Sequence, residues 1–359
     1  MDLVNMADYG WVAAWMSGGV PDDLYLGRII TQSKDLYRVV SEQGEMTAEV
    51  AGKFRFEARL GSDFPAVGDF VWMDRGHDLE GHAIIHGVVP RRSAFIRRAA
   101  GRTQDEQIVA ANIDTVFICM AVNNDFNLRR VERYLAIAWD SGALPVVVLT
   151  KADLAEDMES KVSQVQAAAI GADILVTSSM SEDGYTSIRH YIQPGKTVAF
   201  IGSSGVGKST LINRLLGSEA LATRETRNDD KGRHTTTRRE LIRLPGGGMV
   251  VATPGMREIG LDSADLTRTF AEIDELASQC RFSDCTHQQE PGCAVQEAIS
   301  AGAVSPERLE SYQKLKKEAR YEGLNSREIE NTKIKEMFAG VGGYKNARRW
   351  AKEKNKKEH

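Results

Sequence analysis

The chain has 359 residues, of which 42% are hydrophobic and 27% charged, as is typical of a globular protein with two or three domains. The net charge of −4 argues against a protein that binds polyanions over its whole surface, so any nucleic-acid contact must come from local basic patches. No run of about 18 apolar residues is present, and the first residues are acidic, so we expect neither a membrane span nor a secretory signal and place the protein in the cytoplasm.

The N-terminal part is expected to contain an arm over residues 1–23 and a small β-domain over residues 24–98. Five short β-like runs, separated by Gly, Asp and Ser, cover residues 25–31, 36–41, 45–51, 69–73 and 83–89. Five such strands predict a small barrel or sandwich, and we favour an OB-fold, a class that often binds RNA. The pattern alone leaves an SH3-like barrel open.

An Arg-rich segment, Pro90–Arg98, is expected to link this domain to the next one. Two interpretations stay open. The arginines contact phosphates while Phe95 stacks or anchors, or the segment is a solvated connector whose Phe95 and Ile96 dock on the next domain.

The second domain, residues 99–262, alternates strands and helices. Strands are expected at 113–121, 145–149, 174–176 and 197–201, and helices at 128–139, 155–169, 184–193 and 211–216. This alternation predicts an α/β domain with a parallel sheet that is covered by helices on both faces. Cys119 lies in the first of these strands and is expected to be an inert core residue.

A phosphate-binding loop follows the strand at 197–201. The residues Gly202, Ser203, Ser204, Gly205, Val206, Gly207, Lys208, Ser209 and Thr210 match the pattern G-x-x-x-x-G-K-[ST] between a strand and a helix. The glycines let backbone N–H groups surround a phosphate. Lys208 is expected over the β- and γ-phosphates and the Ser209 hydroxyl on Mg²⁺.

Guanine specificity is predicted by the residues after the strands at 145–149 and 174–176. Thr150, Lys151, Ala152 and Asp153 correspond to the N-K-x-D motif of GTP-binding proteins. Asp153 would accept hydrogen bonds from guanine N1–H and the exocyclic amine, which adenine does not offer. Thr150 replaces the usual Asn, and its hydroxyl makes only part of the Asn hydrogen bonds. Ser178 and Ser179 resemble the S-A-K loop, which meets guanine O6.

These base-binding motifs precede the phosphate-binding loop, which is the reverse of the usual order in GTPases. A circular permutation accounts for this order. The basic stretch 218–238 then resembles switch I, in which Thr236, or second Thr235, would complete the Mg²⁺ site and sense the γ-phosphate. A hairpin at 240–244 and 249–251 leads to Thr253, Pro254 and Gly255 of the third GTPase motif.

The C-terminal part, residues 263–330, is expected to be mostly helical and to bind one structural zinc ion. Cys280, Cys285, His287 and Cys293 offer three thiolates and one imidazole within fourteen residues, which suits a closed tetrahedral site. Asp284 and Glu290 are excluded because softer ligands suffice. The basic tail 331–359 either contacts rRNA phosphates or is simply solvated.

Together these motifs make the chain, over about residues 25–325, resemble the ribosome small-subunit-dependent GTPase A (RsgA) family. The resemblance implies an OB domain, a permuted GTPase domain and a C-terminal zinc domain. It also implies GTP/GDP, Mg²⁺ and Zn²⁺ as cofactors. It implies a role in late maturation of the 30S ribosomal subunit, with its 16S rRNA as a partner, and stimulation of GTP hydrolysis by that subunit. We expect a monomer. The resemblance assigns catalysis to His234, with Lys208 and Thr236.

Ala252 departs from the family's D-x-P-G motif, whose Asp holds Mg²⁺ through a water, and Met256 stands where Ras-like proteins carry a catalytic Gln. A second hypothesis is therefore a GTP- and rRNA-binding checkpoint factor that hydrolyses little. A third, a P-loop ATPase, conflicts with Asp153.

Overall fold

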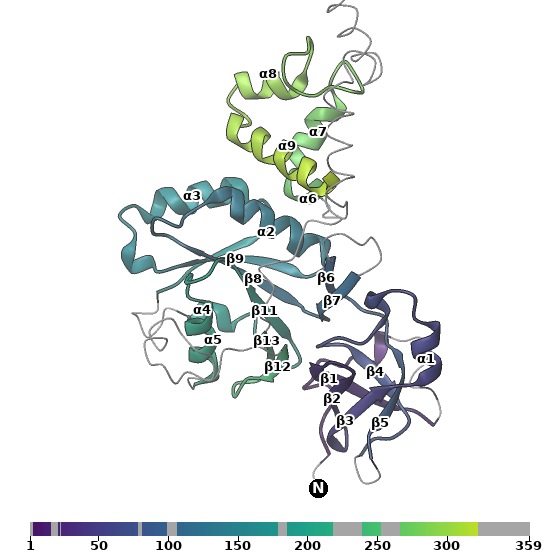
Figure 1. The fold of residues 1–359 in the computed structure, drawn as a ribbon. Helices are drawn as coiled ribbons and strands as arrows, with labels where there is room; N and C mark the ends of the chain where they lie inside the picture. Colours follow the sequence, from purple (N-terminus) through teal and green to yellow (C-terminus); the bar gives the residue numbers. More distant parts are fainter. Residues whose placement is uncertain are drawn as a thin grey trace, which may run out of the picture.

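The computed structural model describes residues 3–15, 21, 23–77, 81–98, 106–178, 185–217, 239–252 and 266–321. Figure 1 shows three bodies in a row: a β-barrel near the N-terminus, a central α/β body, and a group of helices on the far side of that body.

The barrel is built from five strands, β1 (Tyr25–Ser33), β2 (Leu36–Ser41), β3 (Gly44–Val50), β4 (Phe70–Met73) and β5 (Ala83–Val88). They pair in the order β1-β2-β3-β5-β4, and β4 closes the barrel on β1. All pairs are antiparallel except β3 and β5. A closed Greek-key barrel of five strands is the OB architecture, so the OB expectation is confirmed. The helix α1 (Gly52–Glu57) between β3 and β4 was not expected.

A two-stranded ribbon joins the barrel to the central body. The strands β6 (Ala94–Arg98) and β7 (Glu106–Ala111) pair antiparallel. The expectation of a linker over Pro90–Arg98 is therefore wrong for its second half, because the chain returns and pairs with it. Phe95 is 1% exposed and packs in the core of the central body, as the docking alternative predicted, whereas Ile96 stays 36% exposed. The expected domain limit at residue 98 falls between these paired strands.

The central sheet contains β8 (Thr115–Ala121), β9 (Leu144–Thr150), β10 (Asp173–Val176), β11 (Thr197–Ile201), β12 (Glu240–Arg243) and β13 (Met249–Ala252). The order is β10-β9-β8-β11-β13-β12, parallel throughout except for β12. Glu240 of β12 pairs with Thr31 of β1, so the sheet continues into the barrel.

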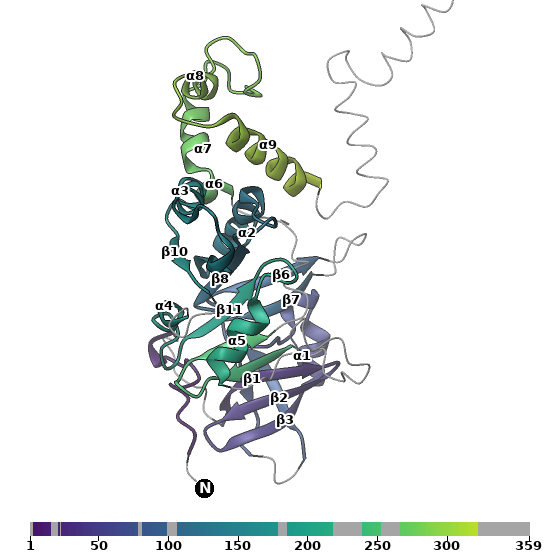
Figure 2. The ribbon, with the colours of Figure 1, turned by 90° about the vertical axis from the view of Figure 1, so that its left-hand side faces the viewer.

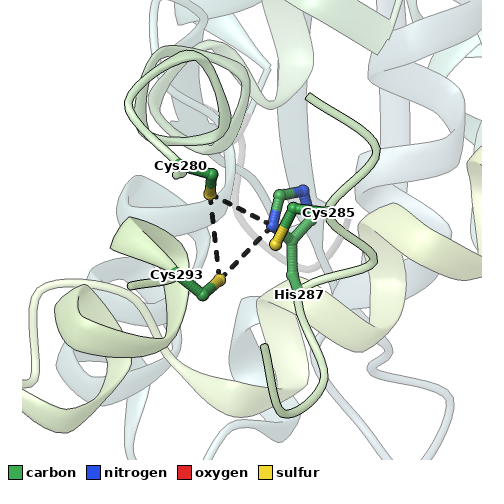
Figure 3. Close-up of side chains that lie close together, drawn as sticks. All are labelled: Cys280, Cys285, His287 and Cys293. Carbon is green, nitrogen blue, oxygen red and sulfur yellow. Dashed lines mark hydrogen bonds between the residues drawn. The ribbon is translucent and has the colours of Figure 1, made fainter. Parts of the chain in front are cut away.

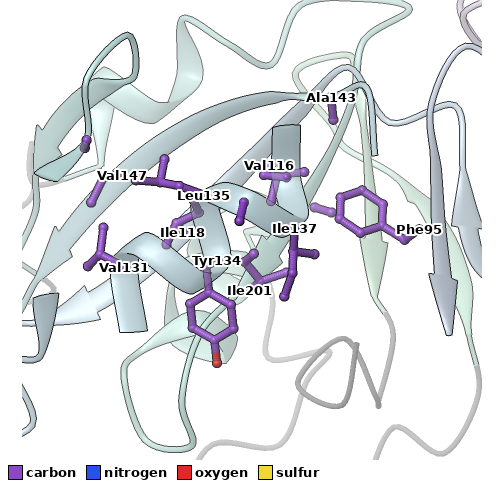
Figure 4. Packing of buried hydrophobic residues seen from close by; sticks show 14 of the residues in the cluster. Phe95, Val116, Ile118, Val131, Tyr134, Leu135, Ile137, Ala143, Val147 and Ile201 are labelled. Carbon is purple, nitrogen blue, oxygen red and sulfur yellow. The ribbon is translucent and has the colours of Figure 1, made fainter. Parts of the chain in front are cut away.

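Helices cover both faces of this sheet, as expected. On one face α2 (Leu128–Asp140) and α3 (Met158–Ala168) pack on the strands through residues such as Val116, Leu135 and Val147 (Figure 4). On the other face, α4 (Thr186–Arg189) and α5 (Lys208–Leu216) cover Phe117 and Val148. Neighbouring residues of one strand thus serve opposite faces. The expected helix 184–193 is observed only as four residues, and α3 starts three residues later than expected, where Asp157 caps it.

A buried arginine fastens the barrel to the central body. Arg28 of β1 is 1% exposed, and its guanidinium donates to the carbonyls of Gly68 (3.2 Å) and Asn112 (3.3 Å) and to Thr197 Oγ1 of β11 (2.8 Å). Burial lowers the pKa of Arg28 to about 9. A buried charge with this many acceptors fixes the geometry of the joint, because any rearrangement would leave it unpaired.

The C-terminal helices are α6 (Leu266–Thr269), α7 (Ala271–Ser278), α8 (Ala294–Ser300) and α9 (Pro306–Tyr321). Figures 1 and 2 show that they stand on α2 and α3. Arg308 of α9 pairs with Glu132 of α2 (2.7 Å) and with Glu272 of α7 (2.6 Å), and it donates to the carbonyl of Thr269 (2.6 Å). The side chains of Arg308 and Glu132 are 11% and 5% exposed.

We expect Arg308→Leu to weaken the attachment of the C-terminal helices by about 3–5 kcal/mol, because it leaves the buried carboxylate of Glu132 without its partner. Hydrogen exchange of the α2 and α9 amides measures this loss. The control is Arg129→Ala, which breaks the exposed ion pair between Arg129 and Glu310 (2.5 Å). An exposed pair contributes at most about 1 kcal/mol to stability. Equal protection in the two variants would contradict the assignment of Arg308 as the anchor.

Candidate nucleotide and metal sites

The glycine-rich loop connects β11 to α5 in a conformation that needs its glycines. Gly202, Gly205 and Gly207 have φ angles of +144°, +76° and +105°. A Cβ on Gly202 would lie 2.4 Å from the Cys119 carbonyl oxygen of the neighbouring strand. Only glycine tolerates both the left-handed backbone and this close approach. The loop therefore turns sharply and leads directly to the first N–H groups of α5, which favour an anion.

Lys208 starts α5, and its ammonium group folds back over the loop. The Nζ atom donates to the carbonyls of Gly202 (2.8 Å) and Ser203 (2.7 Å). This position places a positive charge at the mouth of the loop, where phosphate oxygens would compete with those carbonyls. Ser209 and Thr210 follow in the first turn of α5 and are half-buried.

Thr150 ties the base-binding segment to the phosphate-binding loop. It ends β9, is 3% exposed, and donates from Oγ1 to the Val206 carbonyl (2.6 Å). An Asn amide at this place would make such a contact with its NH₂ group. The hydroxyl of Thr150 therefore supplies at least the loop-bracing part of the role of Asn.

The structure brings together the two segments that were expected to meet guanine. Lys151 adopts a left-handed conformation (φ +58°), and the Ala152 amide donates to the Thr177 carbonyl (3.1 Å). The Ser178 hydroxyl donates to Asp153 Oδ1 (2.5 Å). The carboxylate of Asp153 is thus held at the sheet edge where the strands β9 and β10 both end.

A carboxylate that the sequence analysis missed braces the same loop. Asp125, in the loop after β8, accepts from Ser203 Oγ (2.6 Å) and from Arg130 Nη1 at 2.8 and 2.9 Å. The hydrogen bond from Ser203, and then that from Arg130, lowers the pKa of Asp125 below its usual value. One signal was available, because Asp125 follows the strand that neighbours β11, and the carboxyl ends of parallel strands meet.

Ala252 ends β13 beside the phosphate-binding loop. It is 5% exposed and lies in a buried apolar cluster with Val206 and Leu211. A methyl group there offers no oxygen to a metal ion or to a water. Cys119, from the same cluster, is fully buried, and burial raises the pKa of its thiol to about 12, so it is inert as expected.

Several expected site residues lie outside the described residues: Ser179, His234, Thr235, Thr236, Gly255 and Met256. The tail 331–359 lies outside them as well. Their assignments remain predictions.

The four expected metal ligands converge in the C-terminal helices (Figure 3). Cys280, Cys285, His287 and Cys293 offer ligand atoms that all lie within 4.8 Å of one another. The sulfur atoms of Cys280 and Cys293 are 3.8 Å apart, and His287 Nδ1 lies 3.6 and 3.5 Å from them. A tetrahedral zinc ion with bonds of about 2.3 Å to sulfur and 2.0–2.1 Å to nitrogen requires separations of about 3.8 and 3.5 Å. The residues therefore fit zinc.

Glu290 shapes the loop that carries His287 and is not a ligand. Its carboxylate accepts from the backbone N–H groups of Thr286 (2.8 Å), Gln288 (2.9 Å) and Gln289 (3.1 Å). The hydrogen bond from the Thr286 hydroxyl, and then those from the backbone N–H groups of Thr286 and Gln288, lower the pKa of Glu290 to about 2. Since these donors occupy the carboxylate oxygens of Glu290, the geometry agrees with the expectation that Glu290 is not a metal ligand.

Comparison with known proteins gives consistent results. Residues 88–262 match the family model of the RsgA GTPase. The chain is 52% identical over 339 residues to the small ribosomal subunit biogenesis GTPase RsgA 2 of Lactiplantibacillus plantarum, with 94% of this chain and 96% of that protein covered. It is 45% identical over 332 residues to the RsgA protein of the same description from Opitutus terrae, with 89% and 90% covered.

Solved structures agree. The crystal structure of YjeQ from Thermotoga maritima superimposes with a TM-score of 0.62 and 28% identity, over 82% of this chain and 98% of that one. YloQ, described as a circularly permuted GTPase, superimposes with a TM-score of 0.57 and 26% identity, over 83% of this chain and 96% of that one. The permuted order expected from the sequence is thereby confirmed.

A second family model, that of ABC transporters, matches residues 185–340. This range contains β11, the glycine-rich loop and α5, a unit that many nucleotide-binding proteins share. Among the described helices, none has both the length and the apolar character needed to cross a bilayer.

Proposed function

Because the chain belongs to the RsgA family of GTPases, we propose that it is a GTP hydrolase that acts in late maturation of the 30S ribosomal subunit and is stimulated by that subunit. The observation that carries this proposal is the joined site. Thr150 braces the phosphate-binding loop through Val206, while Ser178 holds Asp153 one strand away. One direct hydrogen bond thus connects the glycine-rich loop with the segment that we propose to hold guanine.

In this proposal the residues Gly202–Thr210 hold the phosphates of GTP or GDP, and Lys208 leaves the loop carbonyls for the β- and γ-phosphate oxygens. Thr150 to Asp153, Ser178 and Ser179 hold the guanine. Ser209 and Thr236 would hold Mg²⁺, which neutralises charge on the phosphates. Thr235, Thr236 and Gly255 would report the γ-phosphate, and His234 would orient the attacking water with Lys208 and Thr236 in support.

The remaining parts of the proposal concern partners. The OB barrel would contact 16S rRNA, because barrels of this class commonly bind oligonucleotides. A zinc ion held by Cys280, Cys285, His287 and Cys293 would stiffen the C-terminal helices that dock on the subunit. The protein would work as a cytoplasmic monomer.

A second candidate function is a GTP-binding assembly checkpoint that hydrolyses GTP slowly. Ala252 favours it, because a buried methyl stands where the family motif has an aspartate beside the loop. Loss of a carboxylate that orients a metal-bound water typically costs 10–100-fold in affinity or activity.

Phosphate release from GTP with and without purified 30S subunits separates these two functions, and Ala252→Asp sharpens the result. We expect the variant to need about 10–100-fold less Mg²⁺ for half-maximal hydrolysis, since it regains the carboxylate. Ala252→Asn is the matched control, with the same shape and no charge, and should behave like the unaltered chain.

Strong stimulation of the unaltered chain would support the GTPase proposal. No release from it together with clear release from Ala252→Asp would instead support the checkpoint function. Equal Mg²⁺ requirements in the Asp and Asn variants would contradict the role given to position 252.

A further inference from the structure

An open cavity lies where the barrel meets the β6–β7 ribbon, far along the chain from the glycine-rich loop. It has a volume of about 470 Å³, within the range of small-ligand sites. The barrel domain contributes the end of β1, the β1–β2 turn, β2, α1 and the segment after α1 that carries Phe64. The ribbon contributes one residue of β6 and the first two of β7. Figure 1 shows the ribbon above the barrel, between it and the central sheet.

Cations from three separate elements line this cavity. Lys34 comes from the β1–β2 turn, Arg55 from α1 and Arg97 from β6, whereas the acidic lining residues are Asp35 and Glu106. Asp35 meets Arg55 at 3.4 Å, and the two side chains are 77% and 50% exposed, so water screens this pair and it is weak. Three cations against two carboxylates leave the lining with an excess of one positive charge, which favours a singly charged anion.

The floor of the cavity is aromatic. Phe64 is half-buried and meets Phe54 edge to face at a centroid distance of 6.2 Å, and Tyr37 is 3% exposed. Burial raises the pKa of Tyr37 to about 12, so its hydroxyl stays protonated. The amides of Gln32 and Gln107 add donors and acceptors at the rim. Aromatic surface, amides and cations in one cavity match a planar base with a phosphate attached.

The cavity wall is also connected to the segment that leads back to the GTPase loops. Arg239 donates to Gln107 Oε1 (3.1 Å) and to the Ile108 carbonyl (3.1 Å) of β7. The next residue, Glu240, begins β12 and pairs with Thr31 of β1. The residue that directly follows the predicted switch I, residues 218–238, is therefore anchored on this wall.

We propose that this cavity binds one nucleotide of single-stranded RNA, with the base against Phe64 and the phosphate among Lys34, Arg55 and Arg97. The inference rests on the proposed function, which supplies RNA as the source of the nucleotide. The same chemistry fits a free mononucleotide, so the experiment separates the two sources.

The test is fluorescence anisotropy of the full chain with a labelled eight-nucleotide single-stranded RNA over a range of salt concentrations. Lys34→Glu should weaken binding about 10-fold and reduce the salt slope by about one, because one phosphate contact is lost. Phe64→Ala should weaken binding about 5–100-fold with the salt slope unchanged, because it removes stacking and no charge. The control is Lys53→Glu, the same charge change at an exposed residue of α1 outside the cavity lining, with less than a twofold effect.

Unchanged RNA affinity in both cavity variants, measured with chains whose circular dichroism matches the unaltered protein, would overturn the proposal. The proposal would also be overturned if the free mononucleotides AMP and UMP bound as tightly as the RNA, because the ligand would then be a free nucleotide. Phosphate release with 30S subunits is measured in parallel on the unaltered chain. If it is stimulated while the cavity variants bind RNA normally, the cavity proposal alone fails; if it is not stimulated, the proposed function fails.

Discussion

Replacement of Asp153 by Asn is expected to change the base preference of the protein from guanine to xanthine. In the proposed site, the carboxylate would accept from two guanine donors, N1–H and the exocyclic amine. An Asn amide still accepts from N1–H but turns an NH₂ group toward the second position, where xanthine carries a carbonyl oxygen. A site that hydrogen-bonds its ligand rejects the wrong partner strongly, because buried polar groups are left unpaired.

The magnitude follows from two changes: the bond from N1–H loses its charged acceptor, and the bond from the exocyclic amine is replaced by a contact between two donors. Hydrogen bonds to a charged group are worth about 1.5–3 kcal/mol each, so GTP affinity should fall by about 10²–10³-fold. Xanthosine triphosphate should then bind better than GTP. Competition of both nucleotides against a fluorescent GDP derivative measures the ratio.

A nearby residue provides the control. Asp157 caps α3, where its Oδ1 accepts from the Ser160 amide (2.9 Å), and Asn caps helices equally well. Asp157→Asn should therefore leave the preference for guanine unchanged. Retained GTP selectivity in Asp153→Asn would show that Asp153 does not read the base.

The parts of the site that local sequence could predict are those whose chemistry lies within a few residues. The glycine pattern from Gly202 to Gly207 encodes its own turn, and the spacing from Cys280 to Cys293 encodes its own cluster. Strand positions were predicted to within about two residues, because burial on one or both faces leaves a periodic signal.

The parts that could not be predicted are contacts between residues far apart in the sequence. Arg28 reaches Thr197, which is 169 positions away, and Arg308 reaches Glu132, which is 176 positions away. No periodicity indicates such pairs, since each partner looks like an ordinary polar or charged residue in its own segment. The β6–β7 ribbon was missed for a related reason. Residues 94–98 form a strand by pairing with β7, and their own sequence, with two arginines at its end, does not indicate that pairing.

One helix gathers several of these long-range contacts. Over four residues α2 presents Arg129 to Glu310, Arg130 to Asp125 and Glu132 to Arg308. Since Asp125 accepts from Ser203 of the phosphate-binding loop, α2 and Asp125 connect the C-terminal helices to that loop. These contacts therefore fix α9 relative to the glycine-rich loop.

Removal of the metal is expected to unfold the C-terminal helices while leaving the nucleotide site intact. These helices span residues 266–321 and have no separate apolar core among the described residues. Their buried apolar side chains join the cluster of the central body: Leu266, Phe270, Ile273, Val295, Val304, Leu309, Tyr312 and Leu315. A body of this size depends on added cross-links. Structural zinc contributes about 10–16 kcal/mol of apparent binding free energy in small metal-dependent folds, which exceeds the stability of most domains.

Cys293→Ser tests this expectation without a chelator, because the serine hydroxyl is a poor zinc ligand. We expect elemental analysis to find about one zinc per unaltered chain and much less in the variant, with lost hydrogen-exchange protection in α7 and α8. Affinity for GTP should stay within about twofold, since the central body packs its own core around β8 and α5. Cys119→Ala, a buried thiol outside the cluster, should keep both its zinc and its protection. A metal-free chain that still protects α8 would show that apolar packing and the Arg308 contacts hold these helices without an ion.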